Sequence, residues 1–434
     1  MRILFCCEFY APSVGGIQEV MRHIAERLVL RGHQVTVATS RLADRSYRML
    51  NGVTIKDFPI SGNSAVGMRG NVSEYQQWVL SEAFDLVMLN MAQQWTLDAL
   101  IPVLKDIRSR KILIPCGFSC LYEPSYDKYY RAMPEVLRQF DHLIFHASDY
   151  RDIRFAKQHG MANMSVIPNG ASQREFSVCK DTTFRQRFGI APDDLLFLTV
   201  GAFTAAKGHG DLARAYLSAD FQGRPSLLLI NANAYRPEAH DVPSQSSLQP
   251  AGVPSLRERI GEMLTHIRRM IARAFERVDA AMHFNREFFS IVEAIHRQGS
   301  KKRVLVVDLP RPELVQAYMH ADLFVFASQI EYSPLVLFES AAAGTPFLSA
   351  QVGNADEVAQ WTGAGVIGPS IIDDKAYTRI DSVRFAERWV QLVQDRGRLH
   401  HMGSEGKRNW AARFTWEKIA QEYEQVFQQV CRAT

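Results

Sequence analysis

The stretch 321–358 constrains the fold of this chain more than any other part of the sequence. It opens with the apolar run Leu323–Ala327, which has the composition of a buried strand in a parallel sheet. A short loop follows, and then a helix is predicted with Ser333 as its N-cap, Pro334 at its first position and Gly344 at its end. A second apolar run after the helix supplies the next strand. Because parallel strands need crossover connections, this order predicts an α/β fold.

The same alternation of apolar strands and helical patterns recurs along the chain. Arg2–Cys7 is predicted as the first strand, residues 17–28 as a helix that ends at Gly32, and Gln34–Thr39 as the next strand. Such a βαβ unit is typical of doubly wound sheets. Further strands are predicted at Val53–Phe58, Asp85–Leu89, Lys111–Ile114, His142–Phe145, Ser165–Ile167, Leu195–Val200, Pro225–Ile230 and Arg303–Val307. Further helices are predicted at Leu97–Ile107, Asp149–His159, Glu313–His320, Val383–Gln394, Leu399–Arg413 and Trp416–Val430.

The predicted elements form two groups separated by a polar segment, residues 171–181, which we interpret as a linker. With 434 residues, the chain is long enough for two domains that each bury a core. We therefore predict two Rossmann-like, doubly wound α/β domains, residues 1–175 and 183–413, that face each other across a cleft. A last helix is predicted at 414–434.

Residues 237–290 are expected to be an insertion in the second domain. A Pro-, Ser- and Gln-rich loop precedes a basic amphipathic helix, Leu256–Val278, which either rests on an anionic membrane or packs on the core with a solvated basic face. The formal net charge of +4 is compatible with peripheral contact at the inner face of a membrane, and we expect no nucleic-acid partner. No apolar run has the length of a membrane span, and the N-terminus lacks the layout of a signal peptide, so we expect a cytoplasmic protein.

The six cysteines show neither disulfide nor zinc-finger spacing. Four of them, Cys6, Cys7, Cys116 and Cys120, lie at or just after the ends of two predicted strands and could meet at one edge of the sheet. Reduced, buried thiols are the usual outcome for such cysteines. We therefore predict neither a disulfide nor a metal site.

Two glutamates flank the start of the helix in the stretch 321–358. Glu331 lies in the loop above the carboxyl end of the strand, and Glu339 follows after seven intervening residues, inside the helix. Between them, the free N–H groups of Leu335 and Val336 form an anion site at the helix N-terminus. Carboxylates beside such a site can accept hydrogen bonds from the hydroxyls of a phosphorylated sugar compound. Ligands of open α/β sheets bind at the carboxyl ends of strands, where this loop lies.

A glycine-containing loop follows the first strand of each half. Gly15 and Gly16 allow close backbone approach and expose N–H groups just before a helix. Gly201 opens a loop that carries Lys207, and a lysine on such a turn can reach a diphosphate as a point charge. Neither loop is a dinucleotide fingerprint or a P-loop.

The stretch 321–358 resembles the E-x7-E segment of the retaining GT-B glycosyltransferases, family four (group one), including the Gly-Thr-Pro after the helix. Residue by residue, the resemblance implies that Glu331 contacts the donor sugar and Glu339 the ribose. It also implies that the backbone amides of Leu335 and Val336 contact the diphosphate.

Other motifs extend the resemblance over most of both domains, apart from roughly residues 237–290. Pro12–Ile17 matches the P-x-x-G-G-I loop of the family, which borders the donor phosphate and the acceptor, and Gly201–Gly208 matches its G-R-L-x-x-x-K-G loop. Val166–Gly170 matches the signature that closes the first domain. Phe414–Ala420 matches the C-terminal segment, whose last helix returns to the first domain in the family. Three residues depart from the family pattern: Gln18 replaces an acidic residue, Ala202 an arginine and Cys116 a histidine near the donor sugar.

The resemblance implies an enzyme that moves a hexosyl group from a nucleotide sugar to an acceptor hydroxyl with retention, without a metal or other cofactor. In that chemistry the departing phosphate takes the acceptor proton, so positioning and charge stabilisation dominate. The candidate catalytic residues are Glu331 and Lys207, and the candidate donor-binding residues are Gly15, Gly16, Gly201, Leu335, Val336 and Glu339. A saccharide or lipid-linked saccharide acceptor, and a role in polysaccharide or glycoconjugate biosynthesis, are what the resemblance suggests.

Three alternatives stay open at this point. A GT-B sugar-nucleotide epimerase shares the architecture, although the E-x7-E spacing argues against it. A glycoside hydrolase needs two carboxylates that face each other across a scissile bond, which a loop-and-helix pair beside an anion site fits less well. A catalytically degenerate GT-B protein that only binds or scaffolds is motivated by Ala202 and Cys116.

Overall fold

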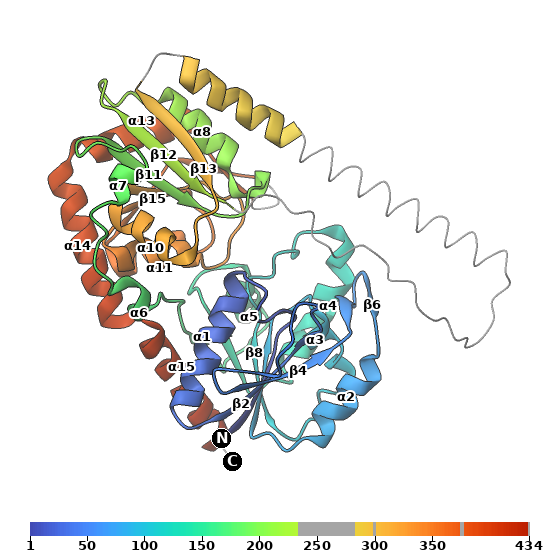
Figure 1. Ribbon diagram of the computed structural model, residues 1–434. Helices are drawn as coiled ribbons and strands as arrows, with labels where there is room; N and C mark the ends of the chain where they lie inside the picture. The colour runs from blue at the N-terminus through green and yellow to red at the C-terminus, as the bar shows by residue number, and fades with distance from the viewer. Residues whose placement is uncertain (233–282, 298–300, 374–376, 433–434) are drawn as a thin grey trace.

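The computed structural model describes residues 1–232, 283–297, 301–373 and 377–432, which form two α/β domains, one above the other in Figure 1. The start of the predicted insertion and the amphipathic helix Leu256–Val278 lie outside the described residues. None of the helices in the described ranges combines the length and the apolar composition needed to span a bilayer.

The first domain is built on an eight-stranded sheet. Across the sheet the strands are β10 (Met164–Val166), β9 (His142–Phe145), β8 (Arg110–Ile114), β7 (Leu86–Asn90), β1 (Arg2–Cys6), β2 (Gln34–Ser40), β4 (Val53–Phe58) and β3 (Met49–Leu50). Neighbouring strands are parallel except β3 with β4. The helices are α1 (Gly16–Leu30), α2 (Val72–Ser81), α3 (Trp95–Asp98), α4 (Asp127–Leu137) and α5 (Arg151–Gln158), and a small hairpin joins β5 (Ser61–Asn63) to β6 (Gly67–Arg69).

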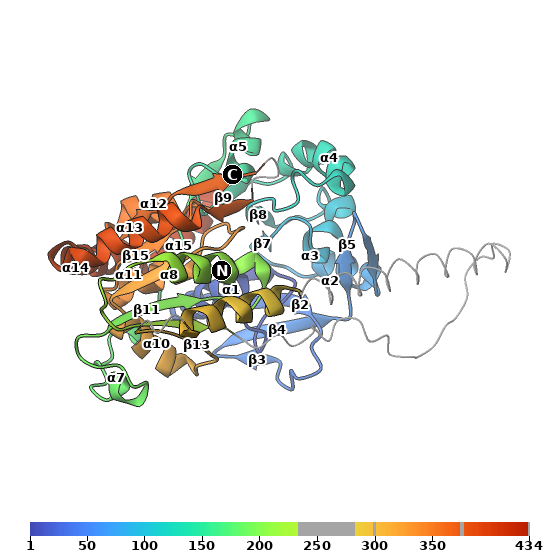
Figure 2. The same ribbon diagram turned by 90° about the horizontal axis from the view of Figure 1, so that it is seen from above.

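The second domain is built on a six-stranded parallel sheet. Across it the strands are β13 (Lys302–Val307), β12 (Ser226–Asn231), β11 (Leu195–Val200), β14 (Leu323–Phe326), β15 (Phe347–Ser349) and β16 (Gly365–Ile367). This is the Rossmann order, in which the connections reverse direction between the first and fourth strands, β11 and β14. The helices are α6 (Gln173–Phe176), α7 (Phe184–Arg187), α8 (His209–Ser218), α10 (Arg311–His320), α11 (Leu335–Ala343), α12 (Ala355–Thr362), α13 (Ser382–Gln394) and α14 (Arg396–Arg413). A further helix over residues 283–297 lies beside β13 and α8 (Figure 2), and β17 (Ser370–Ile372) pairs antiparallel with β18 (Thr378–Ile380).

Helices cover both faces of the sheets, because the central strands are apolar and buried on nearly every residue. In the first domain, α1 and the last helix of the chain cover one face, where the rings of Phe5 and Phe427 meet edge to face at 6.4 Å. Helices α2, α3 and α4 pack on the opposite face around Trp95 and Tyr75, whose ring centroids are 5.0 Å apart. The second domain has a separate apolar core of its own.

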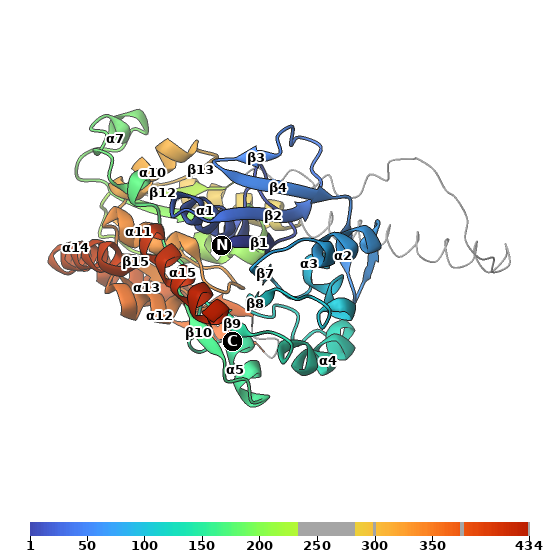
Figure 3. The same cartoon turned by 90° about the horizontal axis from the view of Figure 1, so that it is seen from below.

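The last helix, α15 (Trp416–Arg432), lies on the first domain beside α1 (Figure 3). An ion pair of 2.6 Å joins Arg27 of α1 to Glu417 of α15. The two passages of the chain between the domains run next to each other, because the N–H of Ala171 donates to the carbonyl of Phe414 at 3.0 Å. A Cβ at Gly170 would lie 2.4 Å from that same carbonyl oxygen, so only glycine fits this crossing.

Most predicted strands agree with the structure to within one or two residues, but one predicted helix and one predicted helix cap were wrong. The predicted helix Leu97–Ile107 is replaced by the short α3 and a 3₁₀ turn at Ile101–Val103. Pro102 explains the break, because it has no N–H for the helix ladder and its ring clashes with the preceding turn. The helix predicted to be capped by Ser333 is capped instead by Pro334, whose backbone is extended, with φ −69° and ψ 115°.

Candidate functional site

Two loops meet where the strand order of the second domain reverses. One follows β11 and carries Lys207, and the other follows β14 and carries Glu331. Strands β11 and β14 are neighbours in the sheet and run parallel, so both loops leave from the same edge. In open α/β sheets this is the position at which ligands bind.

Glycines place the Lys207 side chain. Lys207 ends a 3₁₀ turn, Ala205–Lys207, and is followed by Gly208 in the left-handed region at φ +69°. A Cβ at Gly208 would lie 1.8 Å from the carbonyl oxygen of Ala327, so the loop can lie against the end of β14 only without a side chain there. A Cβ at Gly201 would lie 3.3 Å from the Lys207 Cγ. The absence of a side chain at Gly201 therefore gives Lys207 room to pass over this residue.

Lys207 and Glu331 form an ion pair, with 2.5 Å between Nζ and Oε1. The hydroxyl of Ser328 donates to the same Oε1 at 2.8 Å. The two side chains are 30% and 16% exposed, so the pair is accessible from one side. Within the described residues, the contacts of this carboxylate all go to Oε1, which leaves Oε2 without a hydrogen-bond partner. The site therefore combines one cation with one carboxylate oxygen that can accept a hydrogen bond from a ligand.

Helix α11 begins beside this pair without a side-chain cap. The N–H groups of Leu335 and Val336 have no acceptor among the residues that the structure describes. Ser333 provides none, because its buried hydroxyl lacks a hydrogen-bond partner within the described residues. Uncapped N–H groups and the positive end of the helix dipole together favour an anion. The side chain of Leu335 packs against the core of the first domain, which places this helix tip where the domains meet.

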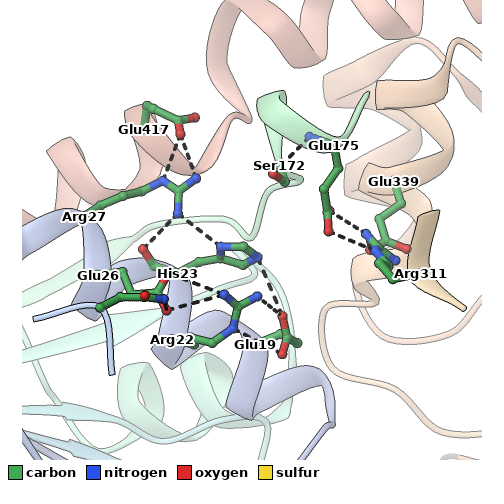
Figure 4. A network of polar contacts seen from close by, with 11 residues as sticks. Glu19, Arg22, His23, Glu26, Arg27, Ser172, Glu175, Arg311, Glu339 and Glu417 are labelled. Carbon is green, nitrogen blue, oxygen red and sulfur yellow. Dashed lines mark hydrogen bonds and ion pairs between the residues drawn. The ribbon is translucent and has the colours of Figure 1, made fainter. Parts of the chain in front are cut away.

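The second glutamate, Glu339, is held by an arginine (Figure 4). The Arg311 Nη2 lies 2.6 Å from the Glu339 Oε1, and the same guanidinium donates to Glu175 at 2.8 and 3.1 Å. Although burial opposes it, the two carboxylates raise the pKa of Arg311, which therefore stays charged. Glu339 is only 14% exposed, so this arrangement fixes its carboxylate at one place.

Helix α1 of the first domain presents a second uncapped start. Its N-cap is Gly15, in extended backbone, and a Cβ at Gly16 would meet nothing within 4 Å, so the space beside this turn is open. Further along α1, Glu19 and Arg22 form an ion pair next to His23 (Figure 4). Burial and the charges of nearby arginines lower the pKa of His23 to about 2, so it is neutral at ordinary pH.

The loop that carries Glu331 is bound directly by the first domain. The Tyr150 hydroxyl donates to the carbonyl of Glu331 at 2.7 Å, and the His146 N–H donates to the hydroxyl of Tyr332 at 2.8 Å. The Asn169 side chain donates to the carbonyl of Ser333 at 3.0 Å. The sequence did not predict these contacts or the role of Arg311. Most of the paired residues are more than a hundred residues apart along the chain; the exception is the pair of Arg311 with Glu339.

The histidines and cysteines near the site are structural. Burial lowers the pKa of both His146 and His209 to about 4, and each ring donates a hydrogen bond to a backbone carbonyl. Burial raises the pKa of the Cys116 thiol, and all six cysteines are free thiols. Within the described ranges, no three His, Cys, Asp or Glu side chains are grouped to hold a metal ion.

The comparison with known families covers both domains. Residues 14–173 match the model described as Glycosyltransferase Family 4, and residues 289–407 match the model described as Glycosyl transferases group 1. Together the two matches take in more than half of the chain. The chain belongs to the family 4, group 1 glycosyltransferases. The family inferred from the E-x7-E segment is therefore confirmed.

Curated relatives of this glycosyltransferase include the N-acetyl-alpha-D-glucosaminyl L-malate synthase of Bacillus anthracis, which is 26% identical over 97% of this chain and 96% of its own. The D-inositol 3-phosphate glycosyltransferase of Corynebacterium diphtheriae is 32% identical over 31% of this chain and 30% of its own.

Solved structures share the fold over the whole glycosyltransferase. The sucrose-phosphate synthase of Thermosynechococcus elongatus superposes with a TM-score of 0.69 at 17% identity, and covers 100% of both chains. Anabaena HepE in complex with UDP superposes with a TM-score of 0.68 at 16% identity, over 99% of this chain and 100% of its own. These likenesses confirm the GT-B architecture of two Rossmann-like domains.

Proposed function

We propose that this glycosyltransferase moves a sugar from a nucleotide-sugar donor to an acceptor hydroxyl, with retention at the anomeric carbon. The observation that carries the proposal is the Lys207–Glu331 pair beside the uncapped start of α11, at the reversal point of the Rossmann sheet. Anabaena HepE, which has the same fold, is described in complexes with UDP and with UDP-glucose, and this supports a nucleotide-sugar donor.

The proposed roles follow from what each group can bind. The free oxygen of Glu331 accepts a hydrogen bond from a hydroxyl of the donor sugar. Glu339, held by Arg311, accepts hydrogen bonds from the ribose hydroxyls. The amides of Leu335 and Val336 bind the diphosphate. Further contacts to the donor are proposed for the backbone of Gly15, Gly16 and Gly201.

Lys207 supplies the charge that the reaction needs. In the described structure its ammonium is neutralised by Glu331 at 2.5 Å, and the diphosphate of a bound donor would compete for it. During transfer, the bond from the anomeric carbon to the phosphate oxygen breaks while the acceptor oxygen bonds on the same face. The departing phosphate takes the acceptor proton. Lys207 and the helix amides stabilise the negative charge that develops on this phosphate, which is why we propose a metal-independent reaction without a cofactor.

The acceptor is proposed to bind at the equivalent reversal point of the first sheet, between β1 and β7. Glu8 follows β1, and its N–H donates to the side chain of Gln94 at 3.4 Å. Burial, together with the charge of Asp98, raises the pKa of Glu8 to about 7. Carboxyl and amide groups suit a hydroxyl-rich acceptor, which supports a saccharide or lipid-linked saccharide and a role in polysaccharide or glycoconjugate synthesis. We further propose a cytoplasmic location, with peripheral membrane contact supported by the net charge of +4.

A panel of nucleoside diphosphates and nucleotide sugars tests the function. A true donor should raise the melting temperature by mass action, and turnover should give a product with the anomeric configuration of the donor, read by NMR. Lys207→Ala should lower kcat about a hundredfold because it removes a charge that acts on the leaving group. The matched control is Lys407→Ala, an exposed lysine on α14, which should leave kcat unchanged. Absence of stabilisation by every compound would contradict the proposal, and binding without turnover would indicate a degenerate, scaffold-type protein.

A further inference from the structure

Tyr332, the residue after Glu331, reaches from the second domain into the first. Its hydroxyl accepts from the His146 N–H at 2.8 Å and is also hydrogen-bonded to the carboxylate of Asp152. Its ring lies 5.4 Å from that of His146 and 5.3 Å from that of Tyr150. All three partners belong to the first domain, so this one side chain joins the two domains.

The socket for the ring is shaped by the turn after β8. Gly117 lies in this turn at φ +87°, and its N–H donates to Asp152 at 2.7 Å. A Cβ at Gly117 would lie 2.9 Å from the Tyr332 Cγ, so the ring occupies the space that a side chain would need. Asp152 is fully buried, and it therefore holds both the turn and the tyrosine hydroxyl in place.

The first domain holds three consecutive residues of this loop. Tyr150 binds the carbonyl of Glu331, the socket binds the side chain of Tyr332, and Asn169 binds the carbonyl of Ser333. Within the second domain, the Asn354 N–H donates to the Tyr332 carbonyl at 2.9 Å, and Lys207 and Ser328 contact the Glu331 side chain. The same asparagine donates through its side chain to the carbonyl of His146 at 2.9 Å, which ties Asn354 to the first domain too.

We propose that Tyr332 is a positioning residue for the transfer reaction: its socket in the first domain, together with Tyr150, holds Glu331 where it can bind the donor sugar beside Lys207. This inference rests on the proposed function. It adds that the sugar part of the donor site is complete only while the first domain holds the loop. The nucleotide part, built from Glu339 and Arg311 on α11 and α10, does not depend on Tyr332.

The division of the site predicts a split between catalysis and nucleotide binding. Tyr332→Phe keeps the ring in its socket but leaves Asp152 and the His146 N–H without the hydroxyl. We expect kcat to fall about tenfold, the loss for one hydrogen bond to a charged group. The Kd for UDP and the KM for the donor should change less than about threefold, because both constants depend mainly on contacts of the nucleotide with the part of the site that contains Glu339 and Arg311. Tyr150→Phe, which frees the Glu331 carbonyl from the first domain, should show the same split.

Hydrogen exchange supplies a readout that does not need activity. In the full-length protein without ligand, the amides of residues 331–333 should exchange about tenfold faster in Tyr332→Phe than in the wild type. The matched control is Tyr216→Phe, which removes a buried tyrosine hydroxyl that lies 2.7 Å from the Ser226 hydroxyl in the second domain, away from the interface. It should change neither kcat nor exchange in this loop.

The outcomes separate the two hypotheses. Unchanged exchange in Tyr332→Phe would overturn the inference, as would an unchanged kcat or an equal loss in Tyr216→Phe. If the wild type turned over no nucleotide sugar at all, the proposed function would fail, and exchange in the loop would still decide whether Tyr332 holds it.

Discussion

Removal of the Arg311 guanidinium is the sharpest test of how the nucleotide part of the site is built. Arg311→Met keeps much of the side-chain volume but leaves Glu339 and Glu175 without the cation that lies 2.6 and 2.8 Å away. If Glu339 binds ribose hydroxyls, its carboxylate loses the fixed position that this binding needs. The expected results are weaker nucleotide binding and a less stable second domain.

The magnitude follows from the contacts. A hydrogen bond to a charged group contributes about 1.5–3 kcal/mol. The Arg311 side chain is 39% exposed, so solvent screens part of this, and we expect about 2 kcal/mol of lost stability. For UDP binding, the loss of one positioned carboxylate corresponds to about 1.4 kcal/mol, a tenfold increase in Kd. The effect on kcat should be less than about twofold, because ribose contacts are the same in the ground and transition states.

Isothermal titration with UDP and urea unfolding measure both effects. Glu175→Gln is the informative companion, since it removes one carboxylate but keeps the pair between Arg311 and Glu339; its Kd for UDP should stay near the wild-type value. Arg187→Met is the matched control, because Arg187 also bridges two carboxylates, Asp181 and Glu313, on the surface of the same domain. Equal UDP affinity in wild type and Arg311→Met, or equal losses in Arg311→Met and Arg187→Met, would refute the reasoning.

Two further predictions concern pH and backbone conformation. Burial raises the pKa of Glu8 from 4.5 to about 7, so the folded protein keeps a proton that the unfolded chain has lost between these values. Stability should therefore fall by about 1–2 kcal/mol as pH rises from 5 to 8, after allowance for partial exposure, and Glu8→Gln should remove that fall in urea unfolding; an identical pH profile in both proteins would contradict this. In thermal melts, Gly208→Ala should lower the free energy of unfolding by more than about 2 kcal/mol, since its Cβ would meet the Ala327 carbonyl oxygen at 1.8 Å. Gly223→Ala is the control and should cost less, because Gly223 has a similar φ of +70° but nothing within 4 Å of its Cβ position. Equal losses of stability in the two variants would mean that backbone strain alone, and not the contact with Ala327, determines the cost of the substitution.

Sequence patterns predicted the fold well because most buried strands are short and apolar and are followed by apolar residues at helical spacing. They also placed Lys207 and Glu331 in loops that follow buried strands, as the two candidate catalytic residues. The structure adds that these loops leave from neighbouring parallel strands, β11 and β14, which brings the two side chains to 2.5 Å. The N-cap at Ser333 was wrong because the loop is held from outside: Asn169 binds the Ser333 carbonyl, and the extended backbone passes to Pro334.

The partners of the site could not be predicted in the same way. Arg311 and Glu175 are 136 residues apart, and no local period links them. Tyr332 was adjacent to a predicted site residue, but its socket is built from turns after two strands of the other domain. Local patterns specify elements, whereas contacts between domains depend on how those elements are packed.

A crystal structure with a bound nucleotide sugar tests the central claim most directly. The account predicts a diphosphate within hydrogen-bonding distance of the Leu335 and Val336 amides, with the Lys207 ammonium turned from Glu331 toward the phosphate. A diphosphate bound elsewhere, with the 2.5 Å pair between Lys207 and Glu331 intact, would contradict it.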